Sequence, residues 1–96
     1  MNYRLLLHKN ASKFLKNVIK KQKEMIKQKL TLLQSDPRNH SQLDIKIMQG
    51  YSDLYHLRIG QYRLIYQIKE NELFIFIMTI GNRGDVYNIF NAGLMF

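Results

Sequence analysis

The spacing of the apolar residues changes once along this chain, at Pro37, its only proline. Before that residue the apolar side chains recur every three or four positions, which is the period of an amphipathic helix. After it they alternate or form continuous runs, which is typical of strands. This order of elements predicts an α+β fold, in which helices pack against a sheet.

Two helices are expected in the first half, after a short strand over residues 2–8. The first helix has Asn10 as its expected N-cap. Its apolar face is formed by Ala11, Phe14, Leu15, Val18 and Ile19. The second helix runs from about residue 23 to residue 35, where the following Asp36-Pro37 ends it, because proline disfavours a helical conformation at the preceding residue. The two helices abut near residues 20–23, so they should form a helical hairpin.

Three strands are expected in the second half, over residues 54–59, 62–69 and 72–80. Two-residue turns at 60–61 and 70–71 separate them. The third strand is apolar on both faces and should lie centrally, covered on both sides. Residues 38–53 are mostly polar and are expected to be irregular. We therefore predict a single domain over residues 1–96, with the N-terminal strand and helical hairpin packed on a mainly antiparallel sheet that contains a three-strand meander.

The turn at residues 60–61 brings charged side chains together. With a two-residue turn, Arg58 lies directly opposite Arg63 on the next strand. Side chains alternate along a strand, so His56 shares the face of Arg58. Like charges that face each other destabilise a strand pair. This cluster therefore needs a compensating anion, or it tolerates the repulsion in solvent.

The chemistry of these groups matches a phosphate ligand. A guanidinium stays charged and binds phosphate through two hydrogen bonds. Nearby positive charge should push His56 toward its neutral form, which can accept a proton as a general base. The alternative interpretation is an exposed basic face with a bystander histidine, which is the commoner meaning of such a cluster on an arbitrary hairpin.

A glycine-rich segment follows the third strand, with the sequence Gly-Asn-Arg-Gly-Asp-Val-Tyr over residues 81–87. Its glycines favour a tight turn that can carry Arg83 and Tyr87 back toward the sheet edge. Tyr87 can stack on an unpaired base or form a hydrogen bond with a phosphate oxygen. The alternative is a surface loop followed by a tyrosine that only packs.

The charge balance favours a polyanionic partner. Fifteen Lys and Arg against seven Asp and Glu leave a net charge of +8. Lysines are frequent in the helical half, and Lys13 and Lys20 are candidate contacts to a nucleic-acid backbone. A solvated helix face is the simpler alternative. The chain has no cysteine, which excludes disulfides and thiolate metal sites and suits the cytoplasm.

We expect neither a metal, a cofactor nor a membrane contact. No His, Asp and Glu spacing matches a metal site, and no glycine loop of the phosphate-cradling type is present. The longest apolar stretch, residues 73–80, is far below the roughly 20 residues that span a bilayer. The apolar run at the N-terminus is too short for a signal peptide.

An ordered set of motifs resembles the RelE/ParE superfamily, the toxin components of type II toxin–antitoxin pairs. The set comprises residues 55–68 (YHLRIGQYRLIYQI), the apolar strand after them, Ile80-Gly81-Asn82-Arg83 and Asp85-Val86-Tyr87. The stretch from Lys46 to Gly50 is similar to the family's short lead-in of lysine, a hydrophobic residue, any residue and glycine, with one extra residue. The resemblance covers about residues 2–88 and includes the helical hairpin. The apolar tail after Tyr87 departs from it.

The resemblance implies an activity and a set of roles. In the RelE branch it implies cleavage of messenger RNA in the ribosomal A site, without metal, by attack of a ribose 2′-hydroxyl on the adjacent phosphate. By position, Arg63 and Arg83 would bind the scissile phosphate and Tyr87 would orient the nucleotide. His56 and Arg58 fall where some branches carry lysines, and we take His56 as the proton acceptor. Lys46 joins Lys13 and Lys20 as an RNA-binding candidate.

The resemblance also implies a partner, a small antitoxin with an acidic tail that masks the basic site. Two other functions stay open at this point. One is the ParE branch, which inhibits DNA gyrase without cutting nucleic acid, since a shared fold does not fix the target. The other is a degenerate toxin that binds its antitoxin and has no activity.

Overall fold

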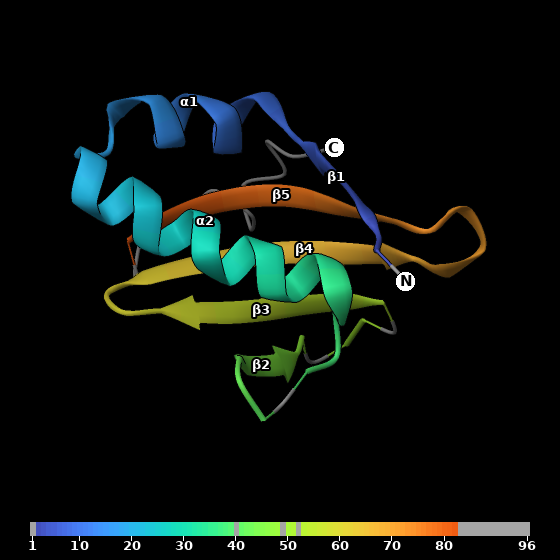
Figure 1. Cartoon of the computed structure of the whole chain (residues 1–96). Helices are drawn as coiled ribbons and strands as arrows, with labels where there is room; N and C mark the ends of the chain where they lie inside the picture. The colour runs from blue at the N-terminus through green and yellow to red at the C-terminus, as the bar shows by residue number, and fades with distance from the viewer. Residues whose placement is uncertain (1, 40, 49, 52, 83–96) are drawn as a thin grey trace.

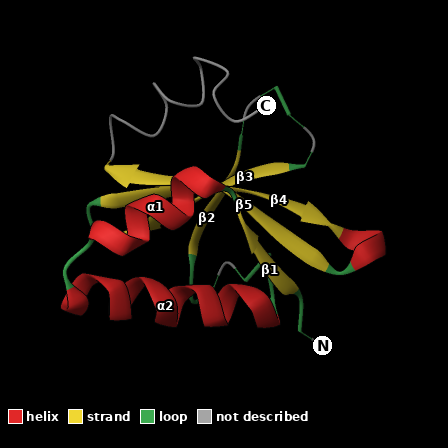
Figure 2. Cartoon of the chain, turned by 90° about the horizontal axis from the view of Figure 1, so that it is seen from above, coloured by secondary structure: helices red, strands yellow, loops and turns green. Residues whose placement is uncertain are grey.

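The computed structural model describes residues 2–39, 41–48, 50–51 and 53–82. The elements follow in the order β1 (Arg4–Leu7), α1 (Lys9–Asn17), α2 (Lys20–Ser35), β2 (Asp44–Ile47), β3 (Leu54–Ile59), β4 (Tyr62–Lys69), a 3₁₀ turn (Glu70–Glu72) and β5 (Phe74–Asn82). The strands form one sheet in the order β1-β5-β4-β3-β2. Both helices lie on the same side of it (Figure 2), with α2 across β3 and β4 and α1 beside β5 (Figure 1).

The predicted α+β architecture is confirmed. Strands β3, β4 and β5 form the expected antiparallel meander, and β2 extends it antiparallel to β3. Strand β1 precedes the two helices and pairs in parallel with β5, the last strand of the described residues. The apolar strand β5 lies between β1 and β4, so it is an interior strand, as its composition predicted.

The main core fills the space between the helices and the sheet. From the sheet it takes alternate residues such as Leu57 and Leu64, and from α2 it takes Ile26 and Leu33, all fully buried. Burying side chains of this size stabilises the fold by about 1.5–3 kcal/mol each. A second, smaller cluster on the opposite face of the sheet contains Leu54, Ile65 and Met78.

The helix boundaries differ from the prediction. His8, rather than Asn10, is the N-cap of α1, and its Nδ1 accepts a hydrogen bond from the Asn10 amide at 3.1 Å. Val18 and Ile19 take extended backbone angles and separate the two helices, so α2 begins at Lys20. Both linking residues are β-branched and fit an extended conformation well, and Ile19 is two-thirds exposed (67%). The predicted helix therefore continued two residues too far, although Val18 still packs against the core.

Three predictions about the strands need correction. The first strand is shorter than residues 2–8, and the segment 38–53 contains the strand β2. The connection after β4 is a 3₁₀ turn closed by Leu73 with a positive φ of 53°, so β5 begins at Phe74 and pairs Lys69 with Phe74. A bulge in β5 shifts the pairing from Ile65–Thr79 to Tyr66–Ile77. No helix in the described part of the chain has the length and apolar character needed to cross a membrane.

Candidate functional site

The β3–β4 hairpin has the predicted register. Gly60 has a positive φ of 58°, which suits the first residue of a two-residue type II′ turn. Ile59 pairs with Tyr62, and Arg58 pairs with Arg63. The residues that flank such a turn exchange hydrogen bonds, so the arginines form the next, closer pair, with Cα atoms about 4.5 Å apart. The two guanidiniums therefore begin from neighbouring backbone positions.

The charged side chains lie on the face of the sheet that the helices leave uncovered. Leu57 and Leu64 point into the core beneath the helices. Their neighbours in the alternation, His56 and Arg58 on β3 and Arg63 on β4, therefore point away from it. Strand β2 adds Lys46 opposite His56 and Asp44 opposite Arg58. We call these five charged or titratable residues, Asp44, Lys46, His56, Arg58 and Arg63, the basic face.

Asp44 is the residue of the basic face that the sequence analysis missed. It supplies a carboxylate beside Arg58 on the side away from Arg63, so the arginine pair is partly compensated from within the protein. Neither guanidinium forms an ion pair with a carboxylate of the described residues. Arg58 is exposed and Arg63 is half-buried. Both remain able to bind an anion from outside.

The environment of His56 favours its neutral form. Burial lowers the pKa of His56 first, and the positive charges of Arg63 and Lys46 lower it further, while Asp44 acts in the opposite sense. The sequence predicted the direction of this shift from neighbouring arginines alone. The structure adds burial as the larger cause, and it assigns the charge effect to Arg63 and Lys46 rather than to Arg58. A neutral imidazole on this face can accept a proton.

The other residues predicted for the site do not all lie on the basic face. Lys46 joins the basic face, whereas Lys20 is the first residue of α2, which covers the opposite face of the sheet. Lys13 lies on α1, beside the end of β5. Arg83 and Tyr87 lie outside the described residues. In β5 the residue paired with Arg63 is Gly81.

A family model described as the ParE toxin of the type II toxin–antitoxin system parDE matches residues 5–87. The chain belongs to this toxin family. The resemblance to the RelE/ParE superfamily that the motifs of β3, β4 and β5 indicated is thereby confirmed. The match includes the whole basic face.

Relatives of the toxin carry RelE names. The toxin is 28% identical over 87 residues to a Methanocaldococcus jannaschii protein named as toxin RelE1. The matched region covers 91% of this chain and 97% of that protein. It is similar to a chain of the archaeal RelE–RelB complex from Pyrococcus horikoshii, with a TM-score of 0.77 and 29% identity over 88% of this chain and 98% of that one. A mutant of E. coli toxin RelE in the free state gives a TM-score of 0.72 and 27% identity, covering 92% and 93% of the two chains.

Proposed function

We propose that this toxin is an endoribonuclease that cleaves messenger RNA on the ribosome. The observation that carries the proposal is the basic face, where Arg58 and Arg63 pair across a tight hairpin beside a histidine whose pKa is lowered. Two facing guanidiniums fit a phosphodiester, which offers several oxygens to paired donors. The RelE names of the similar proteins support the messenger RNA branch of the superfamily.

In the proposed reaction the neutral His56 removes the proton from a ribose 2′-hydroxyl. The 2′-oxygen then attacks the adjacent phosphorus, and the bond from phosphorus to the 5′-oxygen of the next nucleotide breaks. The products are a 2′,3′-cyclic phosphate and a 5′-hydroxyl that takes its proton from water. Negative charge grows on the phosphate oxygens in the transition state, and Arg63 is placed to stabilise it.

The other candidates have supporting roles in this proposal. Arg58 holds a second phosphate oxygen, and Lys46 contacts the RNA backbone beside His56. The family resemblance assigns Arg83 to the scissile phosphate and Tyr87 to the orientation of the nucleotide. Lys13 and Lys20 are proposed as backbone contacts, with Lys20 on the helix-covered side and so remote from the cleavage point. Apart from the water that protonates the leaving oxygen, the reaction as proposed needs only side chains of the protein.

We also propose that an antitoxin protein binds and inhibits this toxin in the cytoplasm. The P. horikoshii relative was solved as a complex of RelE with RelB. A net charge of +8 favours a partner with acidic segments, which would cover the basic face by charge complementarity. An antitoxin of this kind competes with RNA for the same groups.

A second candidate, inhibition of DNA gyrase, is favoured by the ParE description of the matching family. The two functions separate cleanly in assays with purified toxin. On ribosomes programmed with a defined message, nuclease activity gives new 5′ ends in the A-site codon, and Arg63→Ala or His56→Ala removes them. Lys21→Ala, an exposed charge on α2, should retain cleavage. Loss of gyrase supercoiling with intact message would instead support the ParE alternative and refute the nuclease.

A further inference from the structure

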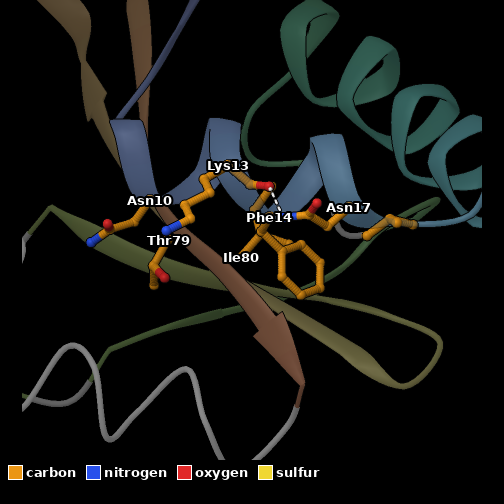
Figure 3. Close-up of a pocket in the computed structure, with 7 residues that line it drawn as sticks. Asn10, Lys13, Phe14, Asn17, Thr79 and Ile80 are labelled. Atoms are coloured by element: carbon orange, nitrogen blue, oxygen red, sulfur yellow. Dashed lines mark hydrogen bonds between the residues drawn. The ribbon is translucent and has the colours of Figure 1, made fainter.

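A pocket of about 330 Å³ lies between α1 and the last part of β5 (Figure 3). Strand β1 pairs with β5 only as far as Ile77, so beyond that residue α1 occupies the place of a neighbouring strand. The wall of the pocket is formed by Asn10, Lys13, Phe14, Asn17, Val18, Thr79 and Ile80. Ile80 belongs to the core beneath the helices, whereas Thr79 pairs with Ile65 of the opposite cluster. The pocket therefore wraps around an edge of β5 that pairs with no other strand of the described residues.

The Thr79 hydroxyl is the unusual group in this pocket. Thr79 is 1% exposed, and its Oγ1 has no hydrogen-bond partner among the described residues. Buried hydroxyls in folded proteins are nearly always bonded, because an unpaired one loses its water without replacement. The bulge in β5 sets this position, since it brings Thr79 opposite Ile65. Since Thr79 lines the pocket, a ligand seated there is a candidate partner for this hydroxyl.

The pocket combines a polar and an apolar side. Lys13 and Thr79 point into the same part of it, and Phe14 lies beside Ile80 (Figure 3). The Asn17 amide already donates to the Lys13 carbonyl at 3.1 Å, which helps to hold that turn of α1. Phe14, Val18 and Ile80 supply an apolar wall. A ligand that suits both sides carries a negative charge, a flat apolar body and a polar edge.

We propose that this pocket binds the nucleotide next to the scissile phosphate. The base lies against Phe14, Val18 and Ile80, the Thr79 hydroxyl bonds its polar edge, and the Lys13 ammonium pairs with a phosphate. The volume is that of a small-ligand pocket and admits a base with its ribose. An acidic side chain of an antitoxin would satisfy Lys13 and Thr79 but would leave the apolar wall uncovered.

The position of the pocket fits a neighbouring nucleotide. Arg63 pairs with Gly81, and Thr79 lies two residues earlier on the same strand. One strand spacing and two residues of rise place the Thr79 and Arg63 backbones roughly 8 Å apart. That separation is comparable to one step along an extended RNA strand. The inference rests on the proposed nuclease function. It adds a subsite that binds the nucleotide next to the scissile phosphate and so positions the message.

The test uses ribosomes programmed with a message, in single-turnover cleavage at increasing concentrations of the full-length toxin. For Thr79→Val and for Lys13→Gln, the half-saturating toxin concentration should rise roughly three- to tenfold, with the saturating rate retained. Thr79→Ser keeps the hydroxyl and should behave as the wild type. Lys16→Gln is the matched charge control, because Lys16 lies on the same helix outside this pocket. A plot of the logarithm of the binding constant against the logarithm of the salt concentration should have a slope smaller in magnitude by about 0.7 for Lys13→Gln. Lys16→Gln should leave this slope unchanged.

Photo-crosslinking gives a second readout. The His56→Gln toxin is bound to ribosomes whose message carries 4-thiouridine at one position beside the cleavage site. The subsite predicts crosslinks to the α1 peptide that contains Phe14, and a several-fold lower yield with Thr79→Val added. Unchanged saturation curves for both pocket variants, or crosslinks from flanking positions that avoid α1, would overturn the subsite.

The outcomes separate this inference from the function on which it rests. If Arg63→Ala abolishes cleavage while the pocket variants behave as the wild type, the nuclease stands and the subsite is wrong. If the wild-type toxin produces no cleavage, both are overturned. If Thr79→Val and Lys13→Gln weaken binding of a glutamate-rich peptide and leave cleavage unchanged, the pocket serves a protein partner, and the nucleotide subsite is refuted.

Discussion

Arg58 and Arg63 face each other as direct partners across the β3–β4 hairpin. Like charges in this arrangement oppose strand pairing by about 0.2–1 kcal/mol. The compensating Asp44 lies beside Arg58 and not between the two guanidiniums. The fold thus accepts a small electrostatic cost at the position where a phosphate would remove it. A repulsion that a bound anion would relieve supports the proposal that this pair binds a phosphate.

Replacing Arg63 should separate function from stability. Arg63→Ala removes a group proposed to stabilise transition-state charge, so cleavage should fall by about 10²–10³-fold. The free energy of unfolding should change by less than about 0.5 kcal/mol or rise, because one of two repelling charges is lost. Single-turnover cleavage and chemical denaturation measure the two effects. If Arg63→Ala lost activity and also lost much of its free energy of unfolding, unfolding would explain the lost activity, and a catalytic role for Arg63 would be contradicted.

The pH dependence of cleavage should respond in opposite directions to two substitutions on β2. In the proposed reaction His56 acts as a base only when neutral, so the rate should fall as the pH drops through its pKa, which burial and nearby positive charge lower from the usual value. Lys46→Gln removes a positive charge that lowers this pKa, so the acid limb should move to higher pH. Asp44→Asn removes a negative charge that raises the pKa, so the limb should move to lower pH.

The saturating cleavage rate is the quantity to measure, since Lys46 is also a proposed RNA contact. NMR titration of the His56 imidazole gives the same pKa without substrate. If both substitutions displace the acid limb in the same direction, or if neither displaces it, His56 is not the group that limits the rate in acid.

The hairpin that carries the site was predictable because its determinants are local. A glycine at the first turn position and alternation on both sides fix which residues pair, and no distant contact is needed. Strand β2 escaped prediction although the sequence Asp44-Ile45-Lys46-Ile47 alternates polar and apolar residues. Four residues are too few to separate a strand from a loop by pattern alone. The sequence therefore did not show that Lys46 lies beside His56 and Asp44 beside Arg58; the pairing of β2 with β3 shows both.

Other features depend on tertiary structure. The 3₁₀ turn before β5 is closed by Leu73 with a positive φ, a conformation that a leucine rarely adopts and that no local signal predicts. The bulge in β5 falls inside a uniformly apolar run, so the pattern does not show which residue is extra. Thr79 consequently looked like an ordinary strand residue. That its buried hydroxyl lacks a partner among the described residues becomes clear only from the three-dimensional structure.

Gly60 should be sensitive to any side chain. Its φ of 58° costs an L-residue about 1–2 kcal/mol, although a Cβ would meet only Met25 Cε at an ordinary 3.6 Å. Gly60→Ala should therefore lower the free energy of unfolding by that amount through backbone strain. Gln61→Ala, in the same turn and exposed, should change it by less than about 0.5 kcal/mol. Equal effects of the two variants in urea denaturation would contradict the turn assignment.

Tyr66 should matter for the position of β2. Its buried hydroxyl donates to the Pro37 carbonyl at 2.8 Å, and burial raises its pKa. This bond fixes the start of the segment that leads from α2 to β2. Tyr66→Phe should cost about 1–2 kcal/mol, because the carbonyl loses its partner. Tyr3→Phe removes only an exposed, 3.4 Å bond to Glu70 and should cost close to nothing. A Tyr66→Phe variant as stable as the wild type would show that the bond does not hold this segment.

Thr79→Val should make the protein more stable while weakening its proposed hold on RNA. Valine has nearly the same shape as threonine, and it removes a buried hydroxyl that has no partner among the described residues. Relief of that desolvation penalty should raise the free energy of unfolding by about 1 kcal/mol. Thr79→Ser keeps the penalty and loses a buried methyl group, so it should be less stable than the wild type. Thermal and urea unfolding of the three proteins would check the order Val, Thr, Ser. A destabilised valine variant would mean that the Thr79 hydroxyl already has a hydrogen-bond partner in the free protein, which would contradict the nucleotide subsite.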